Sequence, residues 1–87
     1  MERATEDQLA ERIAAAKQQV TVHGLYAHFK HPERQYRVLL VGIDEASEQP
    51  MVTYQALYGN QLIWHRLLSE WLKPTDTGII RFQPVSA

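Results

Sequence analysis

The sequence contains no cysteine and no long apolar run. Without thiols, the 87-residue chain cannot form disulfides, hold an iron–sulfur cluster or use a thiol nucleophile, which suits a reducing compartment. No apolar run approaches the roughly 18 residues that cross a bilayer, and the first twenty residues lack the basic start and apolar centre of a signal peptide. We therefore expect a cytoplasmic protein with no membrane partner.

The sequence also lacks an excess of positive charge. Nine Lys and Arg residues face ten Asp and Glu residues, for a formal net charge of −1. Proteins that bind nucleic acid through its phosphates usually carry a clear basic excess. Nucleic acid therefore stays among the candidate partners but is not favoured, and any basic patch has to arise from folding.

Recognisable catalytic and metal-binding motifs are missing as well. The few serines do not stand in a Gly-Xaa-Ser-Xaa-Gly elbow, and four glycines do not form a phosphate-binding loop. The four histidines lack cysteine partners and the spacing of a zinc motif. Asp44, Glu45 and Glu48 fall in a predicted turn, where acidic residues usually serve solubility and local hydrogen bonding. We predict no metal site, no cofactor and no catalytic residue.

The N-terminal segment has the pattern of an amphipathic helix over residues 6–19. Thr5 followed by Gln8 is a capping-box pattern, and an apolar stripe begins at Leu9 and ends at Val20. A helix of this length is marginal alone in water, so its stripe is expected to dock on the rest of the chain. Pairing with another copy, which would make helix 6–19 a self-association element, is the alternative. Residues 1–23 are accordingly assigned as a helical extension.

From residue 24 the pattern changes to short runs rich in valine, isoleucine and tyrosine, separated by turn residues. A further helical turn is predicted over 68–72, packing Leu68 and Trp71 and halted by Pro74. The pattern predicts a mainly β fold, with residues 24–87 forming a small five-stranded barrel after the N-terminal helix. The expected strands span residues 25–30, 36–43, 51–58, 61–66 and 79–83.

The two strands within 51–66 read as a hairpin whose register decides which side chains share a face. If residues 59–60 form a two-residue turn, Tyr54 lies opposite His65 on the core face, and Trp64 and Arg66 lie toward solvent. A three-residue turn would instead pair Tyr54 with Arg66, because a one-residue slip exchanges the faces. The sequence leaves both registers open.

Trp64 and Arg66 are the leading candidates for ligand contact, since an exposed indole beside a guanidinium can bind a planar or anionic ligand. The alternative is that Trp64 is a large core residue and Arg66 is a capping or salt-bridging side chain. His28 shares a strand side with Tyr26 and is expected to make a structural hydrogen bond or to meet a ligand anion. The predicted ligand-binding set is Tyr26, His28, Lys30, Tyr54, Gln55, Trp64 and Arg66.

One combination of residues resembles a known bacterial family. The resemblance covers residues 24–82 and is carried by Gly24, Tyr26, His28, Phe29, Lys30, Tyr36, Val38, Tyr54, Gln55, Ala56, Leu57, Tyr58, Gly59, Trp64, Arg66, Arg81 and Phe82. These residues are similar to the pattern of a domain of unknown function, number 1653 in that series. The resemblance implies a small Src-homology-3-like barrel and carries no assigned activity.

Three function classes follow from these features. The leading hypothesis is a non-catalytic binding module for a peptide or a small ligand, because the sequence has aromatics and arginine but no nucleophile or acid–base pair. The first alternative is a single-stranded nucleic-acid binder that stacks bases on Trp64. The second is a small enzyme, or an accessory to one, acting on a nucleotide-like metabolite, with His28 as acid or base and Arg66 as anion clamp.

Overall fold

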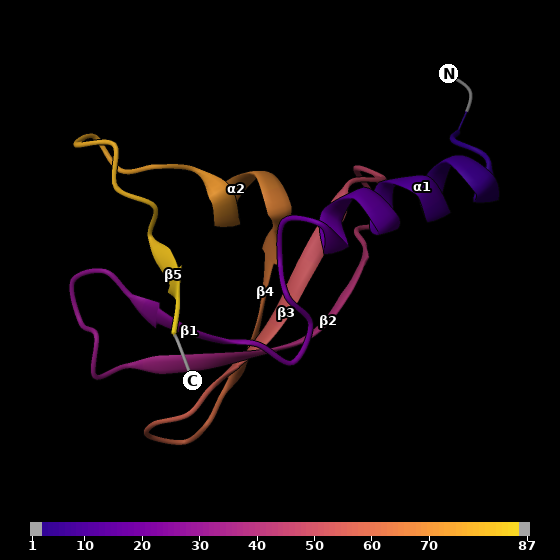
Figure 1. Ribbon diagram of the computed structural model, residues 1–87. Helices are drawn as coiled ribbons and strands as arrows, with labels where there is room; N and C mark the ends of the chain where they lie inside the picture. Colours follow the sequence, from indigo (N-terminus) through magenta and orange to yellow (C-terminus); the bar gives the residue numbers. More distant parts are fainter. Residues whose placement is uncertain (1–2, 86–87) are drawn as a thin grey trace.

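The computed structural model describes residues 3–85, which form two helices and one five-stranded sheet (Figure 1). No helix in this described part of the chain is long and apolar enough to cross a membrane. The elements in chain order are α1 (Glu6–Lys17), β1 (Leu25–His28), β2 (Gln35–Ile43), β3 (Pro50–Ala56), β4 (Ile63–Leu67), α2 (Leu68–Leu72) and β5 (Phe82–Pro84).

The strands form one antiparallel sheet in the order β4-β3-β2-β1-β5, which confirms the predicted mainly β fold with five strands and an N-terminal helix. The sheet does not close into the predicted barrel, since β4 and β5 are its two edges. The segment between them pairs with itself, through a bridge between Pro74 and Ile80, and α2 lies beside it (Figure 1). No backbone hydrogen-bond ladder therefore joins β4 to β5 within residues 3–85, and side chains lie between these two edges.

Helix α1 begins with the predicted capping box. The Thr5 hydroxyl accepts from the Gln8 amide at 3.1 Å, and the Gln8 side chain accepts from the Thr5 amide at 2.9 Å, so two otherwise unpaired donors are satisfied. The helix ends at Lys17, and Ala16 and Val20 are fully buried where it contacts β2 and β3. The apolar stripe thus docks on the sheet.

The acidic loop after β2 anchors the start of α1. The Glu48 carboxylate accepts from the Ala4 amide at 3.3 Å and lies 3.5 Å from Arg3 Nε. The Glu48 carbonyl also accepts from Arg12 Nη1 at 2.8 Å. The sequence predicts local hydrogen bonding for this loop. In the structure, Glu48 accepts hydrogen bonds from Ala4, just before α1, and from Arg12 within it.

The core is built around aromatic rings on one face of the sheet. Phe82 of β5 stacks on Trp71 of α2, with ring centroids 4.1 Å apart, and meets Tyr36 and Tyr54 edge-on at 5.7 and 5.6 Å. Trp71 is 1% exposed and Leu68 is also buried, as predicted for this helical turn. The rings therefore join β5 to the helix and to the middle of the sheet.

The β3–β4 hairpin adopts neither predicted register. Tyr54 pairs with Trp64, because a five-residue loop separates the last hydrogen-bonded pair, in which the Ala56 amide donates to the Leu62 carbonyl at 3.0 Å. The predicted turn is present, closed by the Gln61 amide donating to Tyr58. The Leu57 amide, however, donates to the Gln35 carbonyl of β2 and does not pair with β4. The β3 side of the hairpin therefore contains one more residue than the two-residue turn predicts. This extra residue shifts every pairing of β4 with β3 by one position, so that Tyr54 pairs with Trp64 rather than with His65.

The observed register places two key side chains on the same face as the core tyrosines. Because Trp64 lies opposite Tyr54 and Arg66 opposite Val52, both point to the buried face of the sheet rather than to its outer face. Trp64 is nevertheless 50% exposed, since it stands on an edge strand and no other ring of residues 3–85 packs on it. The alternative of a core tryptophan at this position is therefore wrong.

Candidate functional site

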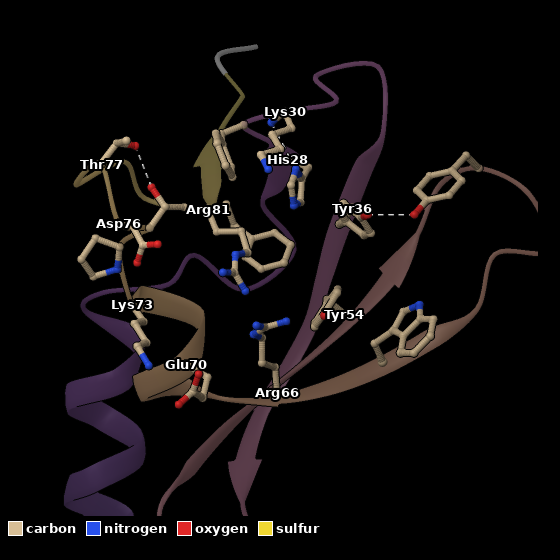
Figure 2. Close-up of a pocket in the computed structure, with 16 residues that line it drawn as sticks. His28, Lys30, Tyr36, Tyr54, Arg66, Glu70, Lys73, Asp76, Thr77 and Arg81 are labelled. Atoms are coloured by element: carbon tan, nitrogen blue, oxygen red, sulfur yellow. Dashed lines mark hydrogen bonds between the residues drawn. The ribbon is translucent and has the colours of Figure 1, made fainter.

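A groove of about 850 Å³ opens between the sheet edges β4 and β5 and is bounded by α2 and the segment that follows it. Its floor contains the rings of Tyr36, Tyr54 and Phe82, and charged side chains surround them (Figure 2). The lining residues are His28, Phe29, Lys30, Tyr36, Tyr54, Tyr58, Trp64, Arg66, Glu70, Lys73, Pro74, Thr75, Asp76, Thr77, Arg81 and Phe82.

Arg66 is the most unusual side chain of the groove. Its guanidinium carbon lies 5.7 Å from the centre of the Phe82 ring, a cation–π distance. Its Nε is buried and has no hydrogen-bond partner within the described part of the chain. Leaving a buried donor of a charged group unsatisfied costs about 1–3 kcal/mol or more. A ligand acceptor at this nitrogen would remove that cost.

Arg81 brings a second guanidinium to the same place. Figure 2 shows the side chains of Arg66 and Arg81 extending toward one another from β4 and from the residue before β5. Within residues 3–85 neither forms an ion pair with a carboxylate within 4.0 Å. Two converging cations repel each other where water is partly excluded, and an anion between them would turn that repulsion into attraction.

The groove concentrates the positive charge that the whole sequence lacks. Four cations line it, Lys30, Arg66, Lys73 and Arg81, against two carboxylates, so the lining carries an excess of two positive charges although the chain has a net charge of −1. The electrostatic field of such a groove favours anions and raises their local concentration.

His28 shows the effect of this charge on a titrating group. Burial lowers the pKa of His28 below 6.5, and the nearby positive groups His31, Arg81, Lys30 and Arg34 lower it further. Its Nδ1 accepts a hydrogen bond from the Lys30 amide at 3.2 Å. With Nδ1 used as an acceptor, the neutral ring carries its proton on Nε2 and acts there as a donor.

Two tyrosines close the groove on the side of the β3–β4 loop. The hydroxyls of Tyr36 and Tyr58 are 2.8 Å apart and share a hydrogen bond (Figure 2). Burial raises the pKa of Tyr36, and the hydrogen bond to Tyr58 raises it further. Arg34 lies over the Tyr58 ring, 5.6 Å from its centre. This wall supplies hydroxyl groups, and the raised pKa of Tyr36 keeps its hydroxyl protonated at neutral pH.

The comparisons with known proteins agree with this architecture. The model of a family described as proteins of unknown function, DUF1653, matches residues 24–84, well over half of the chain. The chain belongs to the DUF1653 family. The match begins after α1, so the helix lies outside the part that the family model describes.

A solved structure supports the same assignment. The crystal structure of a DUF1653 protein from Bordetella bronchiseptica superposes with a TM-score of 0.63 at 29% sequence identity, covering 78% of this chain and 91% of that one. A search of curated proteins finds no match. The family assignment therefore defines the fold and leaves the activity of DUF1653 proteins open.

The predicted ligand-binding residues divide into two groups in this DUF1653 structure. Five of them line the groove: His28, Lys30, Tyr54, Trp64 and Arg66.

The other two lie elsewhere. Tyr26 is buried and its hydroxyl accepts from the Thr21 amide at 2.9 Å. Gln55 is on the other face of the sheet, where its side-chain amide donates to the Gln61 carbonyl at 3.1 Å. Neither contributes to the groove lining.

Several groove residues were not predicted as ligand-binding residues. Arg81 and Phe82 belong to the residues that carry the family resemblance, which was the only signal in the sequence that pointed to them. Glu70, Lys73 and Asp76 lie on or after α2, and nothing in their local pattern separates them from ordinary surface charges. Only the return of β5 to the side of β1 brings these residues together.

Proposed function

We propose that the protein is a non-catalytic binding module whose groove between β4 and β5 holds an anionic ligand, either a small molecule or an acidic group of a peptide. The observation that carries this proposal is the pair Arg66 and Arg81, two guanidinium groups that converge without an ion-pair partner among residues 3–85. A bound carboxylate or phosphate would accept bidentate hydrogen bonds from these groups.

The surroundings of Arg66 support binding at this point. Its Nε is the donor that lacks a partner in the described residues, and the ring of Phe82 orients the guanidinium from one side. The arginine is therefore held before a ligand arrives, which reduces the side-chain entropy lost on binding.

The enzyme alternative needs His28 to accept or deliver a proton. The Lys30 amide occupies Nδ1, so a neutral His28 presents an N–H rather than a free lone pair at its other nitrogen. The cations that lower the pKa of His28 also weaken its capacity to act as a base. His28 is thus better suited to donate a hydrogen bond to a bound anion than to perform general base catalysis.

The test is a titration of the full chain with inorganic phosphate, in which NMR monitors the arginine Nε–H resonances at each phosphate concentration. We expect saturable shifts at Arg66 and Arg81 that diminish as sodium chloride is raised. Arg66→Met should weaken phosphate binding by roughly 10- to 100-fold, because hydrogen bonds to charged groups contribute about 1.5–3 kcal/mol each.

A charge-matched control is available in Arg37→Met. Arg37 lies outside the groove and donates to the His23 carbonyl. This variant should bind phosphate as the wild type does. Unchanged Nε–H resonances of Arg66 and Arg81 across the titration, or equal loss of binding in both variants, would refute the anion-binding proposal.

A further inference from the structure

The groove contains an aromatic surface that the anion site does not use. Trp64 lines the groove, is 50% exposed, and takes part in no ring–ring contact with another described residue. The other aromatic rings of the lining are all stacked or packed edge-on against neighbours. An indole left open at the wall of a cationic groove is suited to stack on a planar group of a ligand.

The distance between the stacking surface and the anion site follows from strand geometry. Trp64 and Arg66 are two residues apart on β4, so their side chains leave the same face about 6.6 Å from each other. A ligand that uses both must carry a planar group and an anionic group joined by a short spacer. The groove volume of about 850 Å³ is within the range of small-molecule sites.

The carboxylates of the groove limit where the ligand can carry negative charge. Glu70 and Asp76 also line the groove, and neither forms an ion pair within residues 3–85 (Figure 2). A ligand that was anionic along its whole length would be repelled by them. Both carboxylates lie on or after α2, beyond Arg66 from Trp64 along the chain, so they favour a ligand whose negative charge is confined to the arginine pair.

We infer that the ligand is a nucleotide unit, with its phosphate between Arg66 and Arg81 and its base stacked on Trp64. This inference rests on the anion-binding function proposed above and names the ligand class. A phosphate monoester matches the excess of two positive charges better than a single peptide carboxylate does. A free mononucleotide and the end of a single strand share this chemistry.

The experiment compares matched ligands on the full chain, monitored by amide and arginine Nε–H shifts. Adenosine monophosphate should bind roughly 5- to 150-fold more tightly than ribose 5-phosphate, the range expected for one base stacked on an aromatic ring. Cytidine monophosphate should show a smaller preference in the same direction, since it has a smaller ring surface. Adenosine monophosphate and ribose 5-phosphate carry the same phosphate group, so the difference between their affinities measures the contribution of the base.

The variant Trp64→Ala separates the two proposals. It should remove the preference for adenosine monophosphate over ribose 5-phosphate while leaving the affinity for inorganic phosphate unchanged, and Trp64→Phe should keep part of the preference. If phosphate binds at Arg66 but the two sugar phosphates bind equally in the wild type, the nucleotide inference is wrong and the anion-binding function stands. If phosphate does not bind either, both fail.

A 5′-phosphorylated trinucleotide distinguishes the source of the nucleotide. Binding much tighter than that of adenosine monophosphate, with a steeper dependence on salt, would identify a single strand as the ligand, because more phosphates are neutralised. Equal affinity would identify a free mononucleotide. Both results support the inference. Loss of binding to both ligands in Arg37→Met would contradict it, because Arg37 lies outside the groove.

Discussion

The indole of Trp71 and the phenyl ring of Phe82 lie parallel, with 3° between their planes and 4.1 Å between their centroids. This stack joins α2 to β5, two elements with no other regular pairing between them. The Phe82 ring also lines the groove, and the Arg66 guanidinium lies over it. The packing of the core and the position of the Arg66 guanidinium therefore share the Phe82 ring.

The two tryptophans should differ sharply in their effect on stability. Trp71→Ala removes a fully buried ring and should lower the free energy of unfolding by about 3–5 kcal/mol. Trp64→Ala removes a half-exposed ring at a sheet edge and should change it by less than about 1 kcal/mol. Urea denaturation monitored by circular dichroism measures both. Similar losses in the two variants would show that Trp64 belongs to the core after all.

Gly24 should be intolerant of a methyl group although its backbone conformation is ordinary. A Cβ at this position would lie 2.9 Å from the Thr21 carbonyl oxygen, closer than real Cβ contacts allow. Gly24→Ala should therefore destabilise the protein by about 1–3 kcal/mol through overpacking.

The control for this prediction is Gly42→Ala. The nearest atom to a Cβ at Gly42 is the flexible Leu40 side chain at 3.8 Å, an ordinary contact. This substitution should be neutral or slightly stabilising, because alanine restricts the unfolded chain. Thermal unfolding of the two variants side by side gives the comparison, and equal melting temperatures would contradict the predicted close contact at Gly24.

Glu48 should hold the start of α1 on the sheet. Glu48→Ala removes the acceptor for the Ala4 amide and the partner of Arg3, so hydrogen exchange of the first turn of α1 should accelerate several-fold. Glu45→Ala removes the same charge, but within residues 3–85 the hydrogen bond of Glu45 to this region uses its backbone carbonyl, which accepts from Arg3. Exchange in this control should stay close to the wild-type rate, and faster exchange in both variants would show that charge alone matters.

The pKa of His28 predicts a pH dependence of stability. Since burial and neighbouring cations lower this pKa below 6.5 in the folded protein, the unfolded chain binds more protons between the folded pKa and 6.5. The contribution of His28 is therefore fully present above pH 6.5 and is lost as the pH falls toward the folded pKa.

His28→Asn tests this contribution, because its side-chain oxygen can still accept from the Lys30 amide while the titrating ring is gone. The variant should lose less stability than the wild type between pH 6.5 and 5. The His28 ring protons, followed by NMR, measure the folded pKa directly. A value of 6.5 or higher would be inconsistent with the desolvated, cation-rich surroundings of the ring, and a rise on adding phosphate is expected if the anion binds beside it.

Local features of the sequence were enough to define most elements. The capping box at Thr5 and Gln8 and the stop at Pro74 depend on residues a few positions apart, and both predicted the structure well. The runs rich in valine, isoleucine and tyrosine also located all five strands, but not all of their bounds. β1 and β3 end two residues earlier than predicted, and β4 and β5 begin two and three residues later. Short-range hydrogen bonding and side-chain period are properties of the local chain, so the sequence alone contains them.

The hairpin register and the groove were decided by contacts between distant segments. The amide of Leu57 donates to Gln35 rather than to β4, and this single bond to a third strand shifts Trp64 and Arg66 onto the face of Tyr54. Arg81 meets Arg66 only because β5 pairs with β1 and leaves the sheet open beside β4. Competition between partner strands for one backbone donor has no local signature, and for that physical reason only the tertiary structure could bring the charged and aromatic side chains into one site.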